Sequence, residues 1–286
     1  MRRATPRRVR EARYKLQRVG LVRFLRYTRL EHAERRKPAP QAGGLFDIGG
    51  GQMILHAGTV PAVRSHWIEY GHGIIEMNAF RRLAADHDVL LDIGAAEGIY
   101  AAAFCALTGK SAWAFEPSPD KFANLEDLRR LNPALDIKSV NLGLDAHSGQ
   151  RTFCRHSDGQ VAGVAASSEG AETLPVTSVD EFVEQHGLAP DFVKIDVEGM
   201  ELDVLRGGQR TFPEFVRTII LELHYDALAG RGQSISDVQL VVERYGFGLE
   251  SLEGATIADL ARYASVHPEP LPGYTVVVCH KRAYGA

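Results

Sequence analysis

The fold of this chain is predicted from one segment, Val89-Leu-Leu-Asp-Ile-Gly-Ala-Ala-Glu-Gly98. Its first five residues are mostly apolar and include β-branched side chains, which is typical of a strand buried on both faces. A glycine ends the strand, and residues 99–108 favour a helix that a second glycine would stop. A further apolar run, residues 111–115, ends at Glu116. The sequence therefore predicts a βαβ unit with a ligand crevice at the carboxyl ends of its strands.

The turn after the first strand does not fit a dinucleotide. The second and third glycine positions of the dinucleotide fingerprint hold Ala96 and Ile99. The carboxylates of Asp92 and Glu97 flank the turn and would repel a pyrophosphate, but they suit a cationic ligand. Glu116 stands where nucleoside-binding folds place an acid on the ribose hydroxyls. S-adenosylmethionine has both groups and is the predicted ligand, although such a glycine turn also occurs simply to pack a helix on a sheet.

Charge divides the chain into unequal parts. Residues 1–37 hold 14 Lys and Arg against three acidic residues, a net charge of +11, so the rest carries −14 within a total of −3. Apolar residues at near-helical spacing predict a basic amphipathic helix that ends before Pro38. This arm could contact an anionic membrane, a nucleic acid or a partner subunit, or could be a solvated helix on the acidic remainder.

The rest of the chain divides into two parts. We expect a lead-in or cap segment over 38–85, in which Tyr70, His72 and Glu76 could cover the crevice, and the main domain over 86–286.

Cysteine usage and hydropathy indicate the compartment. Cys105, Cys154 and Cys279 are odd in number, far apart and without metal-ligand spacing, so we expect free thiols in a reducing environment. The sequence has no apolar stretch long enough to cross a bilayer, and its N-terminus lacks the apolar core of a signal peptide. We therefore expect a cytoplasmic protein.

Downstream segments continue the alternation of helices and strands. We predict a helix over 119–131, a strand over 137–140 and hairpin strands near 151–154. A helix over 178–186 begins with a Ser-x-x-Glu capping box.

A second informative segment is Asp191-Phe-Val-Lys-Ile-Asp-Val-Glu-Gly199. Residues 192–195 predict a short buried strand, interrupted by Lys194 and followed by Asp196 and Glu198 at the crevice edge. A lysine and two acids at the end of a buried strand are costly unless they are paired or used. A purely structural role is also open, in which Lys194 simply pairs with Glu198 or with Glu222.

The next strand, predicted over 215–223, ends in Leu-Glu-Leu-His. Glu222 and His224 are two residues apart and so point to the same side of the strand. If this strand neighbours the preceding one, Asp196, Glu222 and His224 converge at one edge of the sheet. His224 could equally form a hydrogen bond to a neighbouring acid without a chemical role.

These motifs together resemble the FkbM-type methyltransferase family over roughly residues 86–224. The resemblance rests on Asp92-Ile-Gly-Ala-Ala-Glu-Gly98, Phe115-Glu-Pro117, Lys194-Ile-Asp-Val-Glu-Gly199 with Glu201 and Val204-Leu-Arg-Gly207, and Leu221-Glu-Leu-His224. It implies an α/β class I methyltransferase, Rossmann-like fold: a mostly parallel seven-stranded sheet with an antiparallel last strand. Segments 246–252 and 274–280 fit the last two strands. It also implies S-adenosylmethionine as methyl donor and O-methylation of a sugar, polyketide or other natural product.

The predicted site has a cofactor part and a catalytic part. A hydroxyl acceptor must lose its proton during attack, and His224 is the first candidate base, Asp196 the second, with Glu222 beside them. A divalent metal held by these three residues is possible but not favoured. The acceptor could also be an amine or a nucleic acid, and the chain could be a non-catalytic nucleoside-binding module. The predicted cofactor contacts are Asp92, Gly94, Ala95, Glu97, Gly98, Glu116, Pro117, Ser118, Leu144 and Asp196.

Overall fold

The computed structural model describes residues 43–47, 50–57, 60, 63, 72–155, 161–164, 171–266 and 274–282. The basic arm predicted over 1–37 lies outside these residues, as does Tyr70 of the predicted cap. Within the part that is described, no helix is both long and apolar enough to span a membrane. The three cysteines are free, and two of them, Cys105 and Cys279, are buried.

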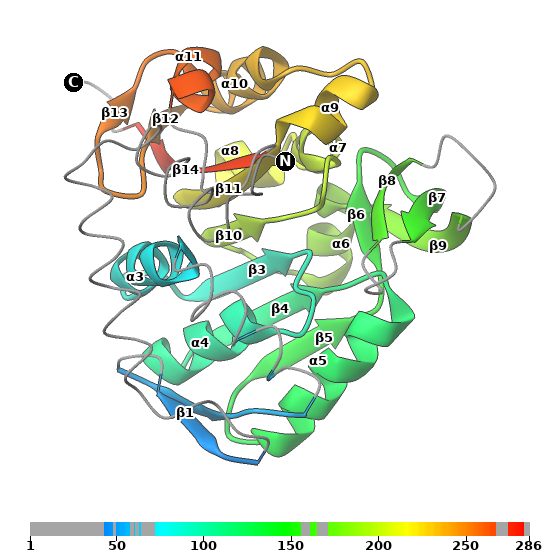
Figure 1. Cartoon of the computed structure of the whole chain (residues 1–286), viewed down its shortest axis with the longest axis vertical. Helices are drawn as coiled ribbons and strands as arrows, with labels where there is room; N and C mark the ends of the chain where they lie inside the picture. Colours follow the sequence, from blue (N-terminus) through cyan, green and yellow to red (C-terminus); the bar gives the residue numbers. More distant parts are fainter. Residues whose placement is uncertain are drawn as a thin grey trace, which may run out of the picture.

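One sheet of eight strands forms the centre of the protein (Figure 1). Five neighbouring strands are parallel, and β14 inserts antiparallel between β11 and β12. The predicted mostly parallel sheet with its antiparallel last strand is confirmed, and the two-residue strand β13 extends its edge. In sheet order the strands are β13 (Thr256–Ile257), β12 (Phe247–Glu250), β14 (Tyr274–Lys281), β11 (Thr218–His224), β10 (Phe192–Ile195), β3 (Val89–Ile93), β4 (Ser111–Phe115) and β5 (Ile137–Val140).

Helices cover both faces of this sheet, as expected when parallel strands are joined by crossovers. One apolar core lies under α3, α4 and α5, and a second lies under α6 to α11. The first three helices are α3 (His72–Ala84), α4 (Ile99–Thr108) and α5 (Pro119–Leu131). The others are α6 (Val179–His186), α7 (Glu201–Gly207), α8 (Thr211–Glu214), α9 (Tyr225–Gly230), α10 (Ile235–Arg244) and α11 (Leu260–Val266).

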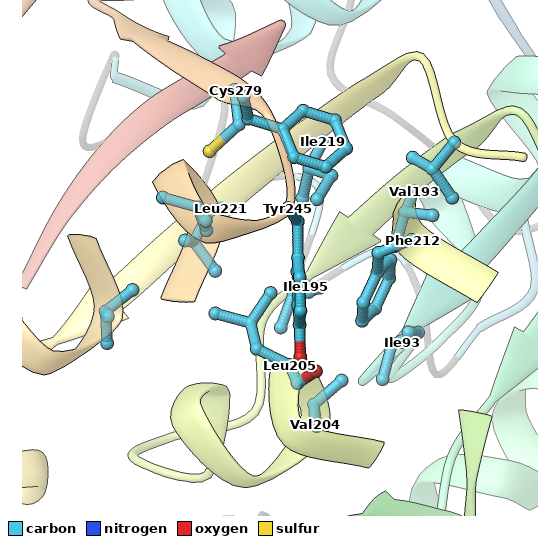
Figure 2. Packing of buried hydrophobic residues seen from close by; sticks show 14 of the residues in the cluster. Ile93, Val193, Ile195, Val204, Leu205, Phe212, Ile219, Leu221, Tyr245 and Cys279 are labelled. Atoms are coloured by element: carbon cyan, nitrogen blue, oxygen red, sulfur yellow. Dashed lines mark hydrogen bonds between the residues drawn. The ribbon is translucent and has the colours of Figure 1, made fainter. Parts of the chain in front are cut away.

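Consecutive side chains along a strand enter opposite cores. In β11, Ile220 packs into the first core while Ile219 and Leu221 pack into the second, which follows from the two-residue repeat of a strand. Figure 2 shows part of the second core, where Tyr245 reaches among aliphatic side chains. Its hydroxyl donates to the carbonyl oxygen of Leu205 at 3.0 Å, so this polar atom is buried with a partner.

A smaller sheet is inserted between β5 and α6 and lies at the right of Figure 1. Its strands, in sheet order, are β6 (Gly143–Asp145), β9 (Ala171–Ser178), β7 (Gly149–Arg155) and β8 (Val161–Val164). The predicted hairpin near 151–154 is therefore confirmed as part of a larger unit. Phe153, Leu174 and Val176 of this sheet pack against Met200, just before α7. This contact brings the insertion to the carboxyl edge of the main sheet.

Some predicted boundaries differ from the structure. The strand predicted from residue 215 begins at Thr218, because residues 211–214 form α8 and Phe215 caps it. Within the predicted lead-in segment, β2 (Gln52–Ile54) pairs with β1 (Leu45–Asp47) as an antiparallel hairpin.

The capping box predicted for α6 is only half formed. The hydroxyl of Ser178 accepts from the backbone N–H of Glu181 at 3.1 Å, as predicted. The carboxylate of Glu181, however, accepts from the hydroxyl of Ser148, which is brought in by the inserted sheet. A complete capping box stands instead at Ser234 and Asp237, at the start of α10.

One carboxylate ties together the amino-terminal ends of two central strands. Asp191 Oδ1 accepts from the backbone N–H groups of Asp88 and Val89, each at 3.0 Å, and its Oδ2 pairs with Arg217. Burial alone would raise the pKa of Asp191, but the hydrogen bonds from His87, Val89 and Arg217 hold it well below its usual range.

We expect Asp191→Asn to lower the free energy of unfolding by about 1–3 kcal/mol near neutral pH, because charged acceptors of buried N–H groups are lost. The folded pKa is depressed, so the stabilisation is present above the unfolded pKa of about 4 and is lost as pH falls through the folded value. Urea titrations of both proteins should therefore converge in acid. The exposed Asp226→Asn serves as control, with an expected change within about 0.5 kcal/mol. Equal stability of Asp191→Asn and wild type at neutral pH would contradict this role.

Candidate active site at the carboxyl edge of the sheet

The glycine turn after β3 lies directly against the end of β10. Gly94 has φ +80°, and the backbone N–H groups of Gly94 and Ala95 both donate to the carbonyl oxygen of Phe115, at 3.0 and 2.9 Å. A Cβ atom on Gly94 would lie 1.8 Å from the carbonyl oxygen of Asp196. Only glycine supplies both the positive φ and the close approach, so this turn brings the ends of three strands together.

Glu116, at the end of β4, is held by the backbone on both oxygens. Its Oε2 accepts from Ala96 N–H at 2.9 Å and its Oε1 from Ser118 N–H at 2.8 Å. The residue is 6% exposed, and burial raises the pKa of Glu116 to about 7 against the opposing effect of these hydrogen bonds. Because a carboxylate oxygen accepts more than one hydrogen bond, both oxygens can still accept from hydroxyl groups.

A cleft opens between this turn and the inserted sheet. Five predicted cofactor contacts line it: Gly94, Glu116, Pro117, Leu144 and Asp196. The lining also includes residues that the sequence motifs do not identify, among them Leu142, Phe153 and Met200. They are ordinary apolar residues without a motif, so only their spatial neighbours distinguish them.

The remaining predicted contacts support the turn from behind or beside it. Asp92 is buried, and its Oδ2 accepts from Ala101 N–H at 3.0 Å at the start of α4. Burial raises the pKa of Asp92 to about 6, although the charge of Lys194 opposes this. Glu97 Oε1 accepts from Lys121 Nζ at 2.6 Å. Three further predicted contacts do not line the cleft. Ala95 belongs to the turn, and Gly98 and Ser118 are the N-cap residues of α4 and α5.

The structure brings Asp196, Glu222 and His224 to one edge, because β10 and β11 are parallel neighbours. His224 Nε2 lies 3.7 Å from Glu222 Oε1 and 3.3 Å from Glu198 Oε2. Glu198, predicted only to lie at the crevice edge, is thus closer to the imidazole than Glu222. The roles of these residues stay predictions.

His224 is oriented from its other nitrogen. Its Nδ1 lies 2.8 Å from Oε1 of Glu201, which is 0% exposed, and its ring stacks on Tyr274. Burial alone would lower the pKa of His224, but the Glu201 hydrogen bond and the charges of the neighbouring carboxylates raise it to about 10. Without another cation beside it, this imidazole carries a proton at neutral pH.

Lys194 lies beneath the cluster, 2% exposed. Its Nζ donates to Asp196 Oδ2 at 3.0 Å and lies 4.6 Å from the ring centre of Tyr100. The hydrogen-bonded partner is therefore Asp196 and not the suggested Glu198 or Glu222, although the charge of Glu222 also acts on Lys194. Burial alone would lower the pKa of Lys194, but four surrounding carboxyl groups raise it above its usual value, so it stays charged. Glu76 of α3, from the predicted cap segment, is one of these four and is buried.

This sheet order, with a glycine turn, an acid at the end of the second strand and a cleft beside them, defines a class I S-adenosylmethionine-dependent methyltransferase fold. Residues 92–249 match the family described as "Methyltransferase FkbM domain". The chain belongs to this family, for which S-adenosylmethionine is the methyl donor.

Among curated proteins, the chain is similar to the hexuronic acid methyltransferase AglP of Haloferax volcanii, with 35% identity over 142 residues. The match covers 49% of this chain and 58% of that relative, so the chain spans little more than half the length of the relative.

Among solved structures, the chain resembles an FkbM methyltransferase from Methylobacillus flagellatus at 16% identity, covering 92% of this chain and 62% of the other, with a TM-score of 0.43. M. capricolum TrmK, in complex with S-adenosylhomocysteine, matches at 13% identity over 72% and 68%, also with a TM-score of 0.43.

Proposed function

We propose that this protein is an O-methyltransferase that transfers the methyl group of S-adenosylmethionine to a hydroxyl of a sugar, with a hexuronic acid as the leading acceptor. The observation that carries the proposal is the group Asp196, Glu198, Glu222 and His224 beside the cleft that Glu116 lines. The activity of the relative from Haloferax volcanii, a hexuronic acid methyltransferase, supports the sugar acceptor.

The residues of the cleft fit the methyl donor. Gly94 and Ala96 of the turn line the cleft, so the backbone of the turn is within reach of a ligand. Glu116 presents its carboxylate to ribose hydroxyls. Pro117, Leu142 and Leu144 offer apolar surface for a purine ring. When bound, S-adenosylmethionine supplies a methyl group on a sulfonium. The neutral thioether that leaves needs no proton from an acid.

The protein has two tasks in such a displacement. It must hold the acceptor oxygen in line with the methyl carbon, at about 3–3.5 Å, and it must take up the proton of the hydroxyl. Among the three predicted groups, Asp196 is bonded to Lys194 and His224 to Glu201. Burial and the charges of Asp196 and Glu76 raise the pKa of Glu222 well above its usual range. Its ionised form is therefore a stronger base than an ordinary carboxylate, and we assign the proton of the hydroxyl to it. In this step a C–O bond forms to the acceptor, the C–S bond of the sulfonium breaks, and the hydroxyl proton ends on the carboxylate of Glu222.

Methyl transfer to defined acceptors tests the function. The full chain is incubated with methyl-labelled S-adenosylmethionine and with glucuronic acid, galacturonic acid, glucose, a primary amine or RNA. We expect label on a uronic acid hydroxyl and little on glucose, amine or RNA. Label on RNA or on the amine would replace the sugar with that class of acceptor, and donor binding without transfer to any acceptor would support a non-catalytic module.

A further inference from the structure

The active-site edge holds more negative than positive charge. Two cationic side chains, Lys194 and His224, lie among six carboxyl groups. The lysine is already hydrogen-bonded to one of them, at 3.0 Å. A cluster of this composition favours a further cation, because like charges at close range are costly in a partly buried site. The six carboxyl groups belong to Glu76, Asp92, Asp196, Glu198, Glu201 and Glu222.

Three ligand atoms lie where one ion could touch them all. Asp196, Glu198 and His224 each offer one atom, and these atoms lie within 4.8 Å of one another. The His224 ring is fixed by its Nδ1 contact with buried Glu201, at 2.8 Å, which turns Nε2 toward the two carboxylates. A carboxylate on the far nitrogen is the usual support of a metal-binding histidine.

A separate observation concerns Glu222, which is 8% exposed. Its carboxylate makes no hydrogen bond within the described residues, and its nearest cationic neighbour is His224 Nε2, 3.7 Å from Oε1. The Glu222 side chain is 11% exposed, and carboxylates buried to this extent normally have hydrogen-bond donors. Glu222 lies near the same nitrogen as Glu198, whose Oε2 is 3.3 Å from His224 Nε2, so it stands beside the cluster.

We propose that Asp196, Glu198 and His224 bind a divalent cation of the Mg²⁺ or Mn²⁺ class, which holds two adjacent oxygens of the acceptor. This set differs from the less favoured set considered from the sequence, Asp196, Glu222 and His224, because Glu198 takes the place of Glu222. The inference rests on the proposed function for its acceptor.

The ligand types select the ion. Two carboxylate oxygens and one imidazole nitrogen form a ligand set that suits Mn²⁺ and Mg²⁺. The set contains no thiolate, the ligand typical of structural zinc sites. Octahedral coordination with three protein ligands leaves positions open for water and acceptor. Adjacent hydroxyls, or a hydroxyl next to the carboxylate of a hexuronic acid, are oxygen donors of the kind such an ion prefers. An ion there would lower the pKa of the bound hydroxyl.

Binding of Mn²⁺ to the metal-depleted full chain tests the site, with free Mn²⁺ followed by electron paramagnetic resonance. We expect one bound ion per chain in wild type, and affinity reduced by more than about tenfold in Glu198→Gln and in Glu201→Gln, which removes the support of His224. The control is Glu250→Gln, whose half-exposed carboxylate lies 3.7 Å from His280 Nε2 and which should bind like wild type. Absence of Mn²⁺ binding in folded wild type, or equal loss in Glu250→Gln, would overturn the proposal.

Failure of the metal site and failure of the proposed function give different results. Mn²⁺ binding is measured without donor or acceptor, so it does not depend on turnover. Methyl transfer to a uronic acid that is unchanged in excess EDTA would reject the metal site and leave the proposed function intact. One bound Mn²⁺ with no transfer to any sugar would support the metal site and reject the acceptor.

Discussion

His224→Ala is expected to reduce the rate of methyl transfer by about 10²–10⁴-fold, the usual contribution of a group that assists proton removal. S-adenosylmethionine affinity should stay within a few-fold of wild type, because His224 lies at the end of β11 among acids, whereas Glu116, the proposed ribose contact, follows the end of β4. Without the imidazole, Glu222, the proposed proton acceptor, loses the cationic neighbour 3.7 Å away, and the proposed cation loses one ligand. Either change leaves the acceptor hydroxyl harder to deprotonate.

A matched control for this variant is available on the neighbouring strand. His280 also faces a glutamate, Glu250, at 3.7 Å, but it pairs in register with Thr218, at the opposite end of β11 from His224. His280→Ala should therefore leave turnover unchanged. Turnover is measured by transfer of labelled methyl to the acceptor, and donor affinity by calorimetry. Full activity of His224→Ala, in protein with a wild-type melting profile, would contradict the placement of the reaction at this edge.

Glu116→Ala is expected to weaken S-adenosylmethionine binding by about 10–100-fold. Hydrogen bonds to a charged acceptor contribute about 1.5–3 kcal/mol, and the residue also anchors Ala96 and Ser118 in the turn. Calorimetric titration with S-adenosylmethionine and S-adenosylhomocysteine measures the loss. Glu126→Gln on α5, whose carboxylate pairs with Arg129, is the control and should bind like wild type. Equal donor affinity in Glu116→Ala would show that the ribose lies elsewhere.

The protonation state of Glu116 adds a pH dependence to donor binding. Burial raises the pKa of Glu116 to about 7, so the carboxylate is formed above that pH and is lost as pH falls through it. Donor affinity should therefore decrease by roughly tenfold between about pH 8 and pH 6, following the ionised fraction. In Glu116→Ala this part of the pH dependence should disappear. A slope that persists unchanged in the variant would assign it to another group.

Elements with local sequence signals could be predicted from the chain. Apolar runs and glycines in consecutive order predict the βαβ unit around residues 89–115. Glu116 is predicted to lie at the crevice because it comes directly after a strand. The meeting of Asp196, Glu222 and His224 at one edge was also predictable, because parallel neighbouring strands carry their carboxyl ends to the same side. These predictions need only the chain order and the periodicity of strands and helices.

Which of the converging groups are in contact depends on packing in the folded protein. Glu198 rather than Glu222 is the nearer carboxylate to His224 Nε2 because the turn after β10 bends it back, with Glu198 at φ 50°. Lys194 pairs with Asp196, and the inserted sheet brings Phe153 to the cleft. Such distances depend on how segments far apart in sequence pack, and motif spacing carries no information about them. The edge of the site was therefore predictable from the chain, whereas its contacts were set by packing.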